Sequence, residues 1–306
     1  MAILRRRDGG AVVALAAHCL VGRSPACTLR VDGSLVSREH ARLQFSDGAW
    51  TVRDLGSSNG TFVDGERLPA GGTRALPAGC QLGFGSAEAG WELVDASPPT
   101  AMARRLEDEA TITPEGGVLA LPSPERPLVS LLESAGKWIL EVEGQARDAR
   151  DGEVVTLAGV AYMLHLPAGS ASTAEADQNV FKKGMAETEI ELRVSRDEEQ
   201  VEVTVRGPAG VHVLAPRAHH YTLLTIARIR VRDRDGALVE AQRGWVTIDD
   251  LMRALRLDEM HLNVEIYRIR KAFTALGLQG GAGVIERRRG ARQLRLGTER
   301  VKIVEA

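Results

Sequence analysis

Hydrophobic and polar residues alternate in short runs through the first hundred residues of the chain. Six β-like runs are separated by Gly, Asp-Gly and Asn-Gly: Val12–Leu15, Thr28–Val31, Ala41–Phe45, Trp50–Asp54, Cys80–Phe84 and Trp91–Val94. Short strands at close spacing with turn residues between them are typical of an antiparallel sandwich. We therefore predict an all-β sandwich over residues 1–96. Ala96-Ser-Pro-Pro-Thr100 then punctuates the chain and predicts a linker over 97–116.

A second β-like block follows, with the runs Glu153–Leu157 and Val160–Leu166 and the sequence KWILEVEG before them. It predicts a small β-rich module over 117–167. The small residues of Ala168–Ala174 then predict a flexible linker over 168–187. For the module we favour a spacer or dimerisation role. The alternative is an incomplete copy of the second half of the first block.

The pattern changes near residue 188 to three alternating runs and then two helical segments. Thr247 stands three residues before Asp250, which is a capping box that opens a helix. The next helix repeats apolar residues in steps of four and three, which defines one buried face: Leu262, Ile266, Ile269, Phe273 and Leu276. The elements predict a small α+β domain over 188–303, and the chain as a whole is multidomain.

The opposite face of this helix carries Asn263, Tyr267 and Arg270, and Arg268 and Lys271 flank them. An arginine-rich hairpin follows, with its turn at Gly290-Ala291 and with these basic side chains: Arg287, Arg288, Arg289, Arg292 and Arg295. Residues 188–298 resemble the winged helix-turn-helix output domain of OmpR/PhoB-type response regulators. The resemblance implies binding of double-stranded DNA through Asn263, Tyr267, Arg268, Arg270, Lys271, Arg287, Arg288, Arg289 and Arg292. The receiver domain of that family is absent, and the loop between the two helices is short.

The charge distribution agrees with a polyanion partner at the C-terminal end. The net charge is only −2, but residues 217–306 hold 18 Lys+Arg against 11 Asp+Glu, a balance of +7. Residues 101–216 hold 11 against 20, a balance of −9, and residues 1–100 hold 10 against 10. A basic segment behind an acidic one favours binding of polyanions at the basic end.

Three short motifs stand in the first block: Gly22-Arg23, then VSREHARL (36–43), then DLGSSNGTFVDG (54–65). In this order they resemble the forkhead-associated (FHA) domain, over roughly residues 5–95. The resemblance implies phosphothreonine binding. A phosphothreonine carries about −1.5 to −2 charges and three acceptor oxygens, so its receptor needs a cation and converging donors.

The resemblance also assigns roles to single residues. Arg23 grips the phosphate, Ser37 donates its hydroxyl and Arg38 adds positive charge. Ser58 and Asn59 come from the neighbouring loop, where Asn59 binds the backbone of the ligand. Three further residues are structural: Gly22 permits the turn, His40 braces the Ser37 loop, and Gly60 forms a turn with Asn59.

Other chemistry is not indicated by the sequence. Cys19, Cys27 and Cys80 have no metal-binding spacing, and we expect reduced thiols. No catalytic motif is present, so we expect neither an enzyme nor a cofactor nor a metal site. No apolar run is long enough to span a bilayer, and we expect a cytoplasmic protein with no membrane partner. Thr111 and Thr113 follow an acidic run in the linker and are candidate phosphoacceptors.

Two functional hypotheses follow. The first is a bacterial transcriptional regulator that couples Ser/Thr-kinase signalling to DNA binding, with a phosphothreonine-containing protein, either a kinase or its substrate, as its second partner. The second is a phosphorylation-dependent adaptor whose winged helix binds protein instead of DNA. The oligomeric state is open in both.

Overall fold

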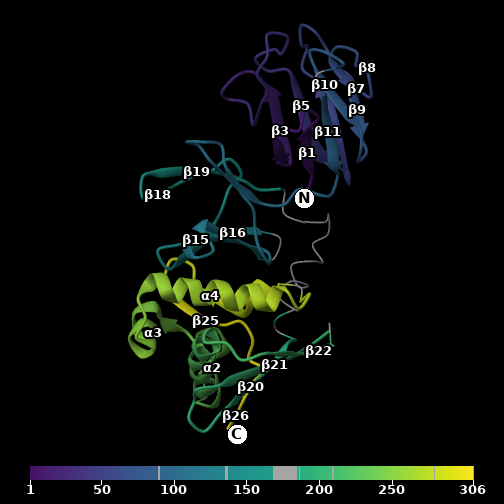
Figure 1. The fold of residues 1–306 in the computed structure, drawn as a ribbon. Helices are drawn as coiled ribbons and strands as arrows, with labels where there is room; N and C mark the ends of the chain where they lie inside the picture. The colour runs from purple at the N-terminus through teal and green to yellow at the C-terminus, as the bar shows by residue number, and fades with distance from the viewer. Residues whose placement is uncertain are drawn as a thin grey trace. The chain divides into compact units, whose positions relative to one another are not determined.

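The computed structural model describes residues 1–88, 90–134, 137–167, 185, 187–208, 210–236, 238–278 and 280–305. They divide into two compact units (Figure 1). The first unit consists of Met1–Arg104 and a short segment that begins at Met163. The second consists of Arg105–Tyr162 and the described residues of the C-terminal part. Each unit is described by itself.

Two β-sheets make up most of the first unit. One has the strand order β2-β1-β11-β10-β7-β8, formed by β2 (Val12–Ala14), β1 (Ile3–Arg6), β11 (Gly90–Asp95), β10 (Gln81–Phe84), β7 (Thr61–Val63) and β8 (Glu66–Arg67). The other has the order β4-β3-β5-β6-β9, formed by β4 (Leu29–Arg30), β3 (His18–Gly22), β5 (Ala41–Ser46), β6 (Ala49–Asp54) and β9 (Thr73–Leu76).

The core of this unit lies between the two sheets. In β6 the inward positions Trp50, Val52 and Asp54 are buried and alternate with more exposed residues, as the period of two along a strand requires. Apolar residues of both sheets form one cluster, which includes Leu4, Leu43 and Trp50. The predicted all-β sandwich is confirmed.

The predicted linker over 97–116 differs from the structure. It contains two strands, β12 (Met102–Arg105) and β13 (Thr111–Ile112). These strands belong to a four-stranded sheet of order β13-β12-β19-β18, with β18 (Val154–Leu157) and β19 (Val160–His165). The predicted module over 117–167 is therefore divided, because its last two strands join this sheet, in which β19 pairs with β12 of the predicted linker. The charged residues near Asp108 occupy the turn between β12 and β13 and misled the prediction.

The rest of that module is an antiparallel sheet of order β14-β15-β16-β17 in the second unit. Its strands are β14 (Val118–Ser123), β15 (Arg126–Ser134), β16 (Lys137–Val142) and β17 (Gln145–Asp148). Two more sheets complete the unit. One has the order β22-β21-β20-β26, with β22 (Gly210–Leu214), β21 (Val201–Gly207), β20 (Glu189–Val194) and β26 (Val301–Glu305). The other has the order β23-β25-β24, with β23 (Val246–Thr247), β25 (Gln293–Leu296) and β24 (Ile285–Arg287).

In the described part of this unit, three α-helices pack among these sheets: α2 (His219–Asp235), α3 (Ile248–Leu255) and α4 (Glu259–Thr274). The N-cap predicted at Thr247 is present, since the Thr247 hydroxyl accepts a hydrogen bond of 3.1 Å from the Asp250 N–H. The predicted apolar stripe of α4 is buried in the main core of the unit through Leu262, Ile266, Ile269 and Phe273. The predicted turn is also present, because β24 and β25 are paired on either side of Gly290.

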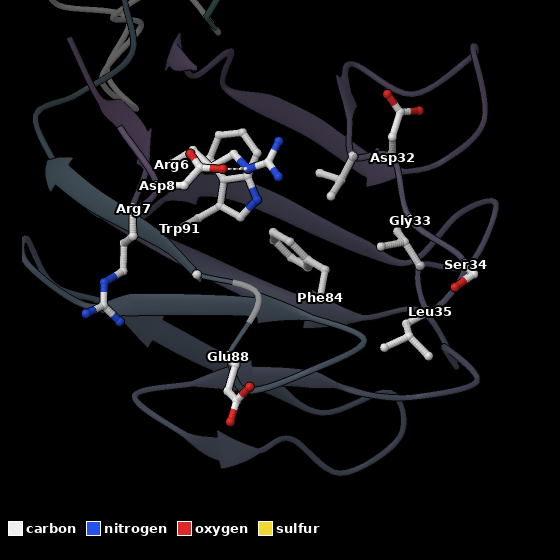
Figure 2. Close-up of a pocket in the computed structure, with 13 residues that line it drawn as sticks. Arg6, Arg7, Asp8, Asp32, Gly33, Ser34, Leu35, Phe84, Glu88 and Trp91 are labelled. Carbon is white, nitrogen blue, oxygen red and sulfur yellow. Dashed lines mark ion pairs between the residues drawn. The ribbon is translucent and has the colours of Figure 1, made fainter. Parts of the chain in front are cut away.

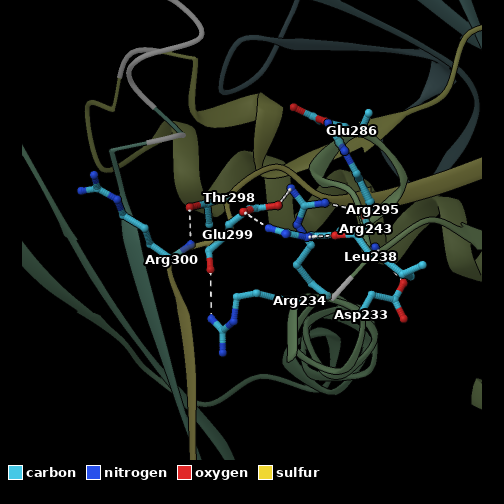
Figure 3. A network of polar contacts seen from close by, with 12 residues as sticks. Asp233, Arg234, Leu238, Arg243, Glu286, Arg295, Thr298, Glu299 and Arg300 are labelled. Carbon is cyan, nitrogen blue, oxygen red and sulfur yellow. Dashed lines mark hydrogen bonds and ion pairs between the residues drawn. The ribbon is translucent and has the colours of Figure 1, made fainter. Parts of the chain in front are cut away.

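The C-terminal strand β26 closes a sheet by pairing in parallel with β20, which the sequence did not predict. Arg234 on α2 donates to the backbone oxygens of Glu299 and Val301, at 3.1 Å each (Figure 3). These bonds fix the segment that leads into β26. Arg243 pairs with the Glu299 carboxylate at 3.0 Å. The domain predicted over 188–303 therefore continues to the end of β26.

The predicted linker over 168–187 lies outside the described residues, apart from positions 185 and 187. Among the described helices, none combines the length and the hydrophobicity needed to cross a membrane.

Candidate functional site

The Arg23 and Ser37 loops are joined directly in the first unit. The Arg23 N–H donates to the backbone oxygen of Ser37 at 3.0 Å. Gly22, the last residue of β3, makes this approach possible, because a Cβ there would lie 2.2 Å from the Arg38 oxygen and 2.9 Å from the Cys27 sulfur. Glycine is thus required at position 22 because two backbone segments pack closely there. The turn conformation that we predicted is not the reason. The φ angle of Gly22 is not in the left-handed region.

His40 connects the Ser37 loop to the Gly60 turn. Its ring is buried, and its Nδ1 accepts a hydrogen bond of 3.1 Å from the Ser37 N–H. Its Nε2 lies 3.1 Å from the Gly60 oxygen and therefore carries the proton and donates. Burial lowers the pKa of His40, which keeps the ring in this neutral form. His40 thus braces the two loops at their base, the role that the resemblance implies.

Asp54 fixes the shape of the next loop. One of its carboxylate oxygens accepts from the Ser57 hydroxyl at 2.6 Å and from the Thr61 hydroxyl at 2.7 Å. The other accepts from the N–H groups of Gly56 at 2.9 Å and Ser57 at 3.1 Å. Burial alone would raise the pKa of Asp54, but these hydrogen bonds outweigh it and lower the pKa. The loop is therefore held by a charged carboxylate beneath it.

Ser58 and Asn59 are carried by that loop toward the Ser37 loop. The Ser58 N–H donates to the Ser37 hydroxyl at 3.1 Å. A hydroxyl that accepts in this way keeps its own hydrogen for another partner. The Asn59 amide nitrogen donates to the Leu35 backbone oxygen at 2.9 Å. Its carbonyl oxygen and second amide hydrogen are not used by that bond.

The result is a cluster of donors at one end of the sandwich. Arg23, Arg38, Ser58 and Asn59 are exposed, and Ser37 is half-buried. The ion pairs formed among the described residues do not include Arg23 or Arg38. The structure therefore brings the predicted loops together, with two guanidinium groups open to an external anion.

A hollow of about 350 Å³ lies in the same unit (Figure 2). Its lining includes Leu35, whose carbonyl holds Asn59, and the aromatic rings of Phe84 and Trp91. Arg6 and Arg7 belong to its rim, and Arg6 forms an ion pair of 2.9 Å with Asp8. The hollow therefore joins the donor cluster through Leu35.

Sequence reasoning missed the residues that support the site from below. Asp54, Ser57 and Thr61 belong to the DLGSSNGT motif, but the resemblance assigns no role to these three positions. A signal was present, because Asp followed by Gly and Ser commonly forms side-chain-to-backbone bonds in a turn. The Cys27 thiol, which lies 3.2 Å from the Arg38 oxygen, had no such signal.

Comparison with known proteins supports this domain. Residues 19–85 match the family model of the FHA domain. The N-terminal unit contains an FHA domain. The matched range runs from β3 through β10 and so includes every loop of the donor cluster.

The curated relatives share only this part of the chain. Zebrafish Nibrin (Danio rerio) is 38% identical over 78 residues, which are 25% of this chain and 9% of Nibrin. The FHA domain-containing protein FhaB of Mycobacterium tuberculosis is 44% identical over 45 residues, 15% of this chain and 29% of FhaB. The chain thus spans less than a third of either relative. Among solved structures, Mycobacterium tuberculosis EmbR in complex with a low-affinity phosphopeptide is 27% identical, covering 32% of this chain and 25% of that one, with a TM-score of 0.29.

The residues predicted to contact DNA lie in the second unit, and several of them are covered by protein. Arg270 is 1% exposed, and its guanidinium binds both carboxylate oxygens of Glu141 on β16, at 2.7 and 2.8 Å. Arg287 binds the same carboxylate at 3.0 Å and donates to the Asn263 side-chain oxygen at 2.7 Å. Tyr267 is buried against β14 and β15. We expected this face of α4 to be open, but the β14–β17 sheet lies on it.

The surrounding basic side chains differ in their accessibility. Lys271 pairs with Glu115 at 2.6 Å, and Arg289 pairs with Asp148 at 2.6 Å. Arg292 pairs with Glu259 on α4 at 3.0 Å. By contrast, Arg268 and Arg288 are exposed and have no carboxylate partner among the described residues.

Burial and charge oppose each other at Glu141. Burial alone would raise the pKa of this carboxyl, but Arg270 and Arg287 together lower it below its ordinary value. Glu141 is therefore a charged group inside the protein, and it is neutralised by two arginines that we had assigned to DNA.

Proposed function

We propose that the N-terminal unit binds phosphothreonine in a partner protein and that the chain acts in signalling through this site. The proposal is carried by one observation, the junction of the Arg23 and Ser37 loops through a 3.0 Å backbone hydrogen bond. Ser58 and Asn59 are hydrogen-bonded to Ser37 and Leu35 in the Ser37 loop. A phosphate dianion needs a fixed cation and several donors, which this arrangement supplies on a rigid sandwich. The partner is a Ser/Thr kinase or one of its substrates.

The proposal is tested by comparing Arg23→Ala with Arg53→Ala, which removes an exposed arginine from β6 outside the cluster. A charge-assisted hydrogen bond contributes about 1.5–3 kcal/mol, so Arg23→Ala weakens phosphothreonine-peptide binding about 10- to 100-fold. Arg53→Ala leaves the affinity unchanged, and neither variant unfolds. Binding is measured by fluorescence anisotropy with a phosphorylated peptide and its unphosphorylated twin. Full affinity in Arg23→Ala would refute the site.

We further propose that the second unit is a winged helix-turn-helix that binds double-stranded DNA, which makes the chain a transcriptional regulator that couples kinase signalling to a promoter. The support is the basic balance of residues 217–306 and the order of helices and hairpin. Arg268 and Arg288 are exposed cations on α4 and on the hairpin. They are the two side chains of the predicted set best placed to meet phosphate in the present arrangement.

Duplex-DNA binding by the full chain tests this second proposal. The logarithm of the affinity falls linearly with the logarithm of the salt concentration, by about 0.9 for each phosphate contacted. Arg268→Ala and Arg288→Ala each reduce this slope by about that amount, while Arg53→Ala in the first unit does not change it. Affinity that is independent of salt would contradict the proposal.

A second candidate function is a phosphorylation-dependent adaptor whose C-terminal helices bind protein. The observation in its favour is that the polar face of α4 already lies against a protein surface, the β14–β17 sheet. Absence of DNA binding in every variant described above and below would favour the adaptor.

A further inference from the structure

The contact between the β14–β17 sheet and α4 has a small apolar part. Val118, Ala120 and Leu132 of the sheet pack on Tyr267 of α4 and on Ala282. This cluster is separate from the main core of the unit, which is formed by α2, α3, α4 and the strands of the other two sheets. The helices are therefore packed on a core of their own, and the β14–β17 sheet is added to its outside.

The remainder of the contact is mainly polar. Glu141 stands at its centre and binds Arg270 and Arg287. Around it, Glu115 pairs with Lys271 and Asp148 pairs with Arg289. The backbone oxygen of Glu143 accepts a hydrogen bond of 2.6 Å from Arg292. Five basic side chains of the predicted DNA-binding set thus receive oxygen ligands from this sheet or the segment before it.

These oxygens stand in for the ligand that the basic groups would otherwise bind. A carboxylate held by two donors of one guanidinium has the planar, bidentate geometry with which arginine also binds phosphate. Negative oxygens at Glu115, Glu141 and Asp148 meet Lys271, Arg270 and Arg289 in turn. The sheet and a nucleic-acid backbone would therefore compete for the same side chains.

The contact also includes features that favour its release. A buried ion pair gains little net energy, because the desolvation of both groups opposes their attraction. The Nε of Arg270 and the Nη1 of Arg287 are buried without a hydrogen-bond partner among the described residues. Each such orphaned donor costs about 1–3 kcal/mol. Between the sheet and the hairpin, the backbone pairs only through one isolated bridge, from Ala146 to Arg289, within the described part of the chain.

We propose that the β14–β17 sheet is an acidic intramolecular ligand that occupies α4 and the arginine hairpin, and that it must leave before duplex DNA binds there. This inference rests on the DNA-binding part of the proposed function. Glu141 is the residue that holds the sheet in place. The sheet is then an inhibitory element in place of a spacer.

A reversible lock tests the proposal in the full chain. Ala146→Cys with Arg289→Cys places one cysteine on each side of the bridge, where neighbouring backbones lie about 4.8 Å apart. That spacing is within the range that a disulfide spans. The oxidised and reduced forms of this one protein are compared for binding of a fluorescent duplex at low salt, and wild type under the same conditions is the control. We expect the reduced form to bind at least 10-fold more tightly than the oxidised form.

Two further variants test whether the DNA affinity depends on Glu141 itself or only on the net charge of the chain. Glu141→Gln removes the central carboxylate, and we expect it to raise the DNA affinity of the full chain about 10-fold. Glu153→Gln makes the same change in a carboxylate that pairs with Arg147 within its own module, at 2.5 Å. Among the described residues, Glu153 bonds to Arg147 and to the Arg150 N–H and not to α4 or the hairpin, so this variant leaves the affinity at the wild-type value.

The outcomes are distinct for the inference and for the proposed function. If the oxidised and reduced forms bind DNA equally well, the inhibitory role of the sheet is overturned while DNA binding stands. If adding duplex DNA slows formation of the 146–289 disulfide, the competition is supported directly, and this readout does not depend on Glu141→Gln being stable. If no form binds DNA, including reduced Ala146→Cys/Arg289→Cys and Glu141→Gln, the DNA-binding proposal itself is overturned.

Discussion

Single residues decide whether the Arg23 and Ser37 loops meet. Gly22 is required because a side chain there would collide with the Arg38 carbonyl. His40 is required because one ring must accept from Ser37 and donate to Gly60 at once. Both residues act below the surface, and neither needs to touch a ligand to control the geometry of Arg23 and Ser37.

Gly22→Ala is expected to damage both the site and the domain. The added methyl would lie 2.2 Å from the Arg38 oxygen, so the backbone must shift. Overpacking of this kind costs about 1–3 kcal/mol of unfolding free energy. The same shift separates the two loops and weakens phosphopeptide binding. Gly283→Ala is the control, because its new methyl would lie 3.8 Å from Met185 and has room. Thermal unfolding and peptide anisotropy measure the two effects, and wild-type values in Gly22→Ala would contradict this account.

At the residue scale, the sequence identified the loops that the structure brings together. The motifs around Arg23, Ser37 and Asn59 are local and carry a recognisable order. What local motifs do not contain is the long-range contact. Arg270 and Glu141 are 129 positions apart, and nothing in the α4 sequence indicates a buried carboxylate above it. For that reason the sequence predicted that the polar face of α4 is exposed to solvent.

At the scale of elements, α4 is an example of a helix with two covered faces. Its apolar stripe follows the helical period and was predicted correctly. Its polar face is covered by the β14–β17 sheet, and this depends on tertiary packing that periodicity does not report. The strands β12 and β13 were missed for a related reason. They are short, they flank a charged turn, and their β-structure depends on a sheet in which β12 pairs with β19 and β13 pairs with β12.

The charged state of Glu141 predicts how this packing responds to acid. Folding lowers its pKa below the ordinary 4.5, so the charged carboxyl stabilises the folded unit above that pH. This contribution is lost as the pH falls through the lowered folded-state value. Glu141→Gln, which leaves two arginines without their partner, costs about 3–5 kcal/mol at pH 7. The difference from wild type should shrink steadily below about pH 4.

The partly exposed Glu153 is the matched control for that experiment. Its pair with Arg147 is open to solvent, and such pairs contribute about 0–1 kcal/mol. Glu153→Gln should therefore change stability little at any pH. The unfolding free energy is measured by denaturant titration between pH 3 and pH 7. A Glu141→Gln difference that does not vary with pH would contradict the charged state assigned here.

At the scale of the whole molecule, two arginines of the first unit and two of the second are in opposite states. Arg23 and Arg38 of the first unit are exposed and unpaired among the described residues. Arg270 and Arg287 of the second unit are neutralised inside the protein. The exposed arginines of the first unit are thus accessible to an anion. The buried arginines of the second unit already bind the Glu141 carboxylate. The division of the chain into a sandwich and an α+β part was predictable from patterning, while this difference in readiness was not.

The buried cysteines of the first unit have a practical consequence. Cys19, Cys27 and Cys80 are all free and buried. Burial raises the pKa of Cys19 to about 12 and that of Cys80 to about 11, and it also raises the pKa of Cys27. Only the thiolate attacks alkylating reagents, so these side chains are poor nucleophiles at neutral pH. A maleimide dye or spin label will therefore react with one cysteine added on the surface. The three native cysteines do not need to be replaced for such labelling.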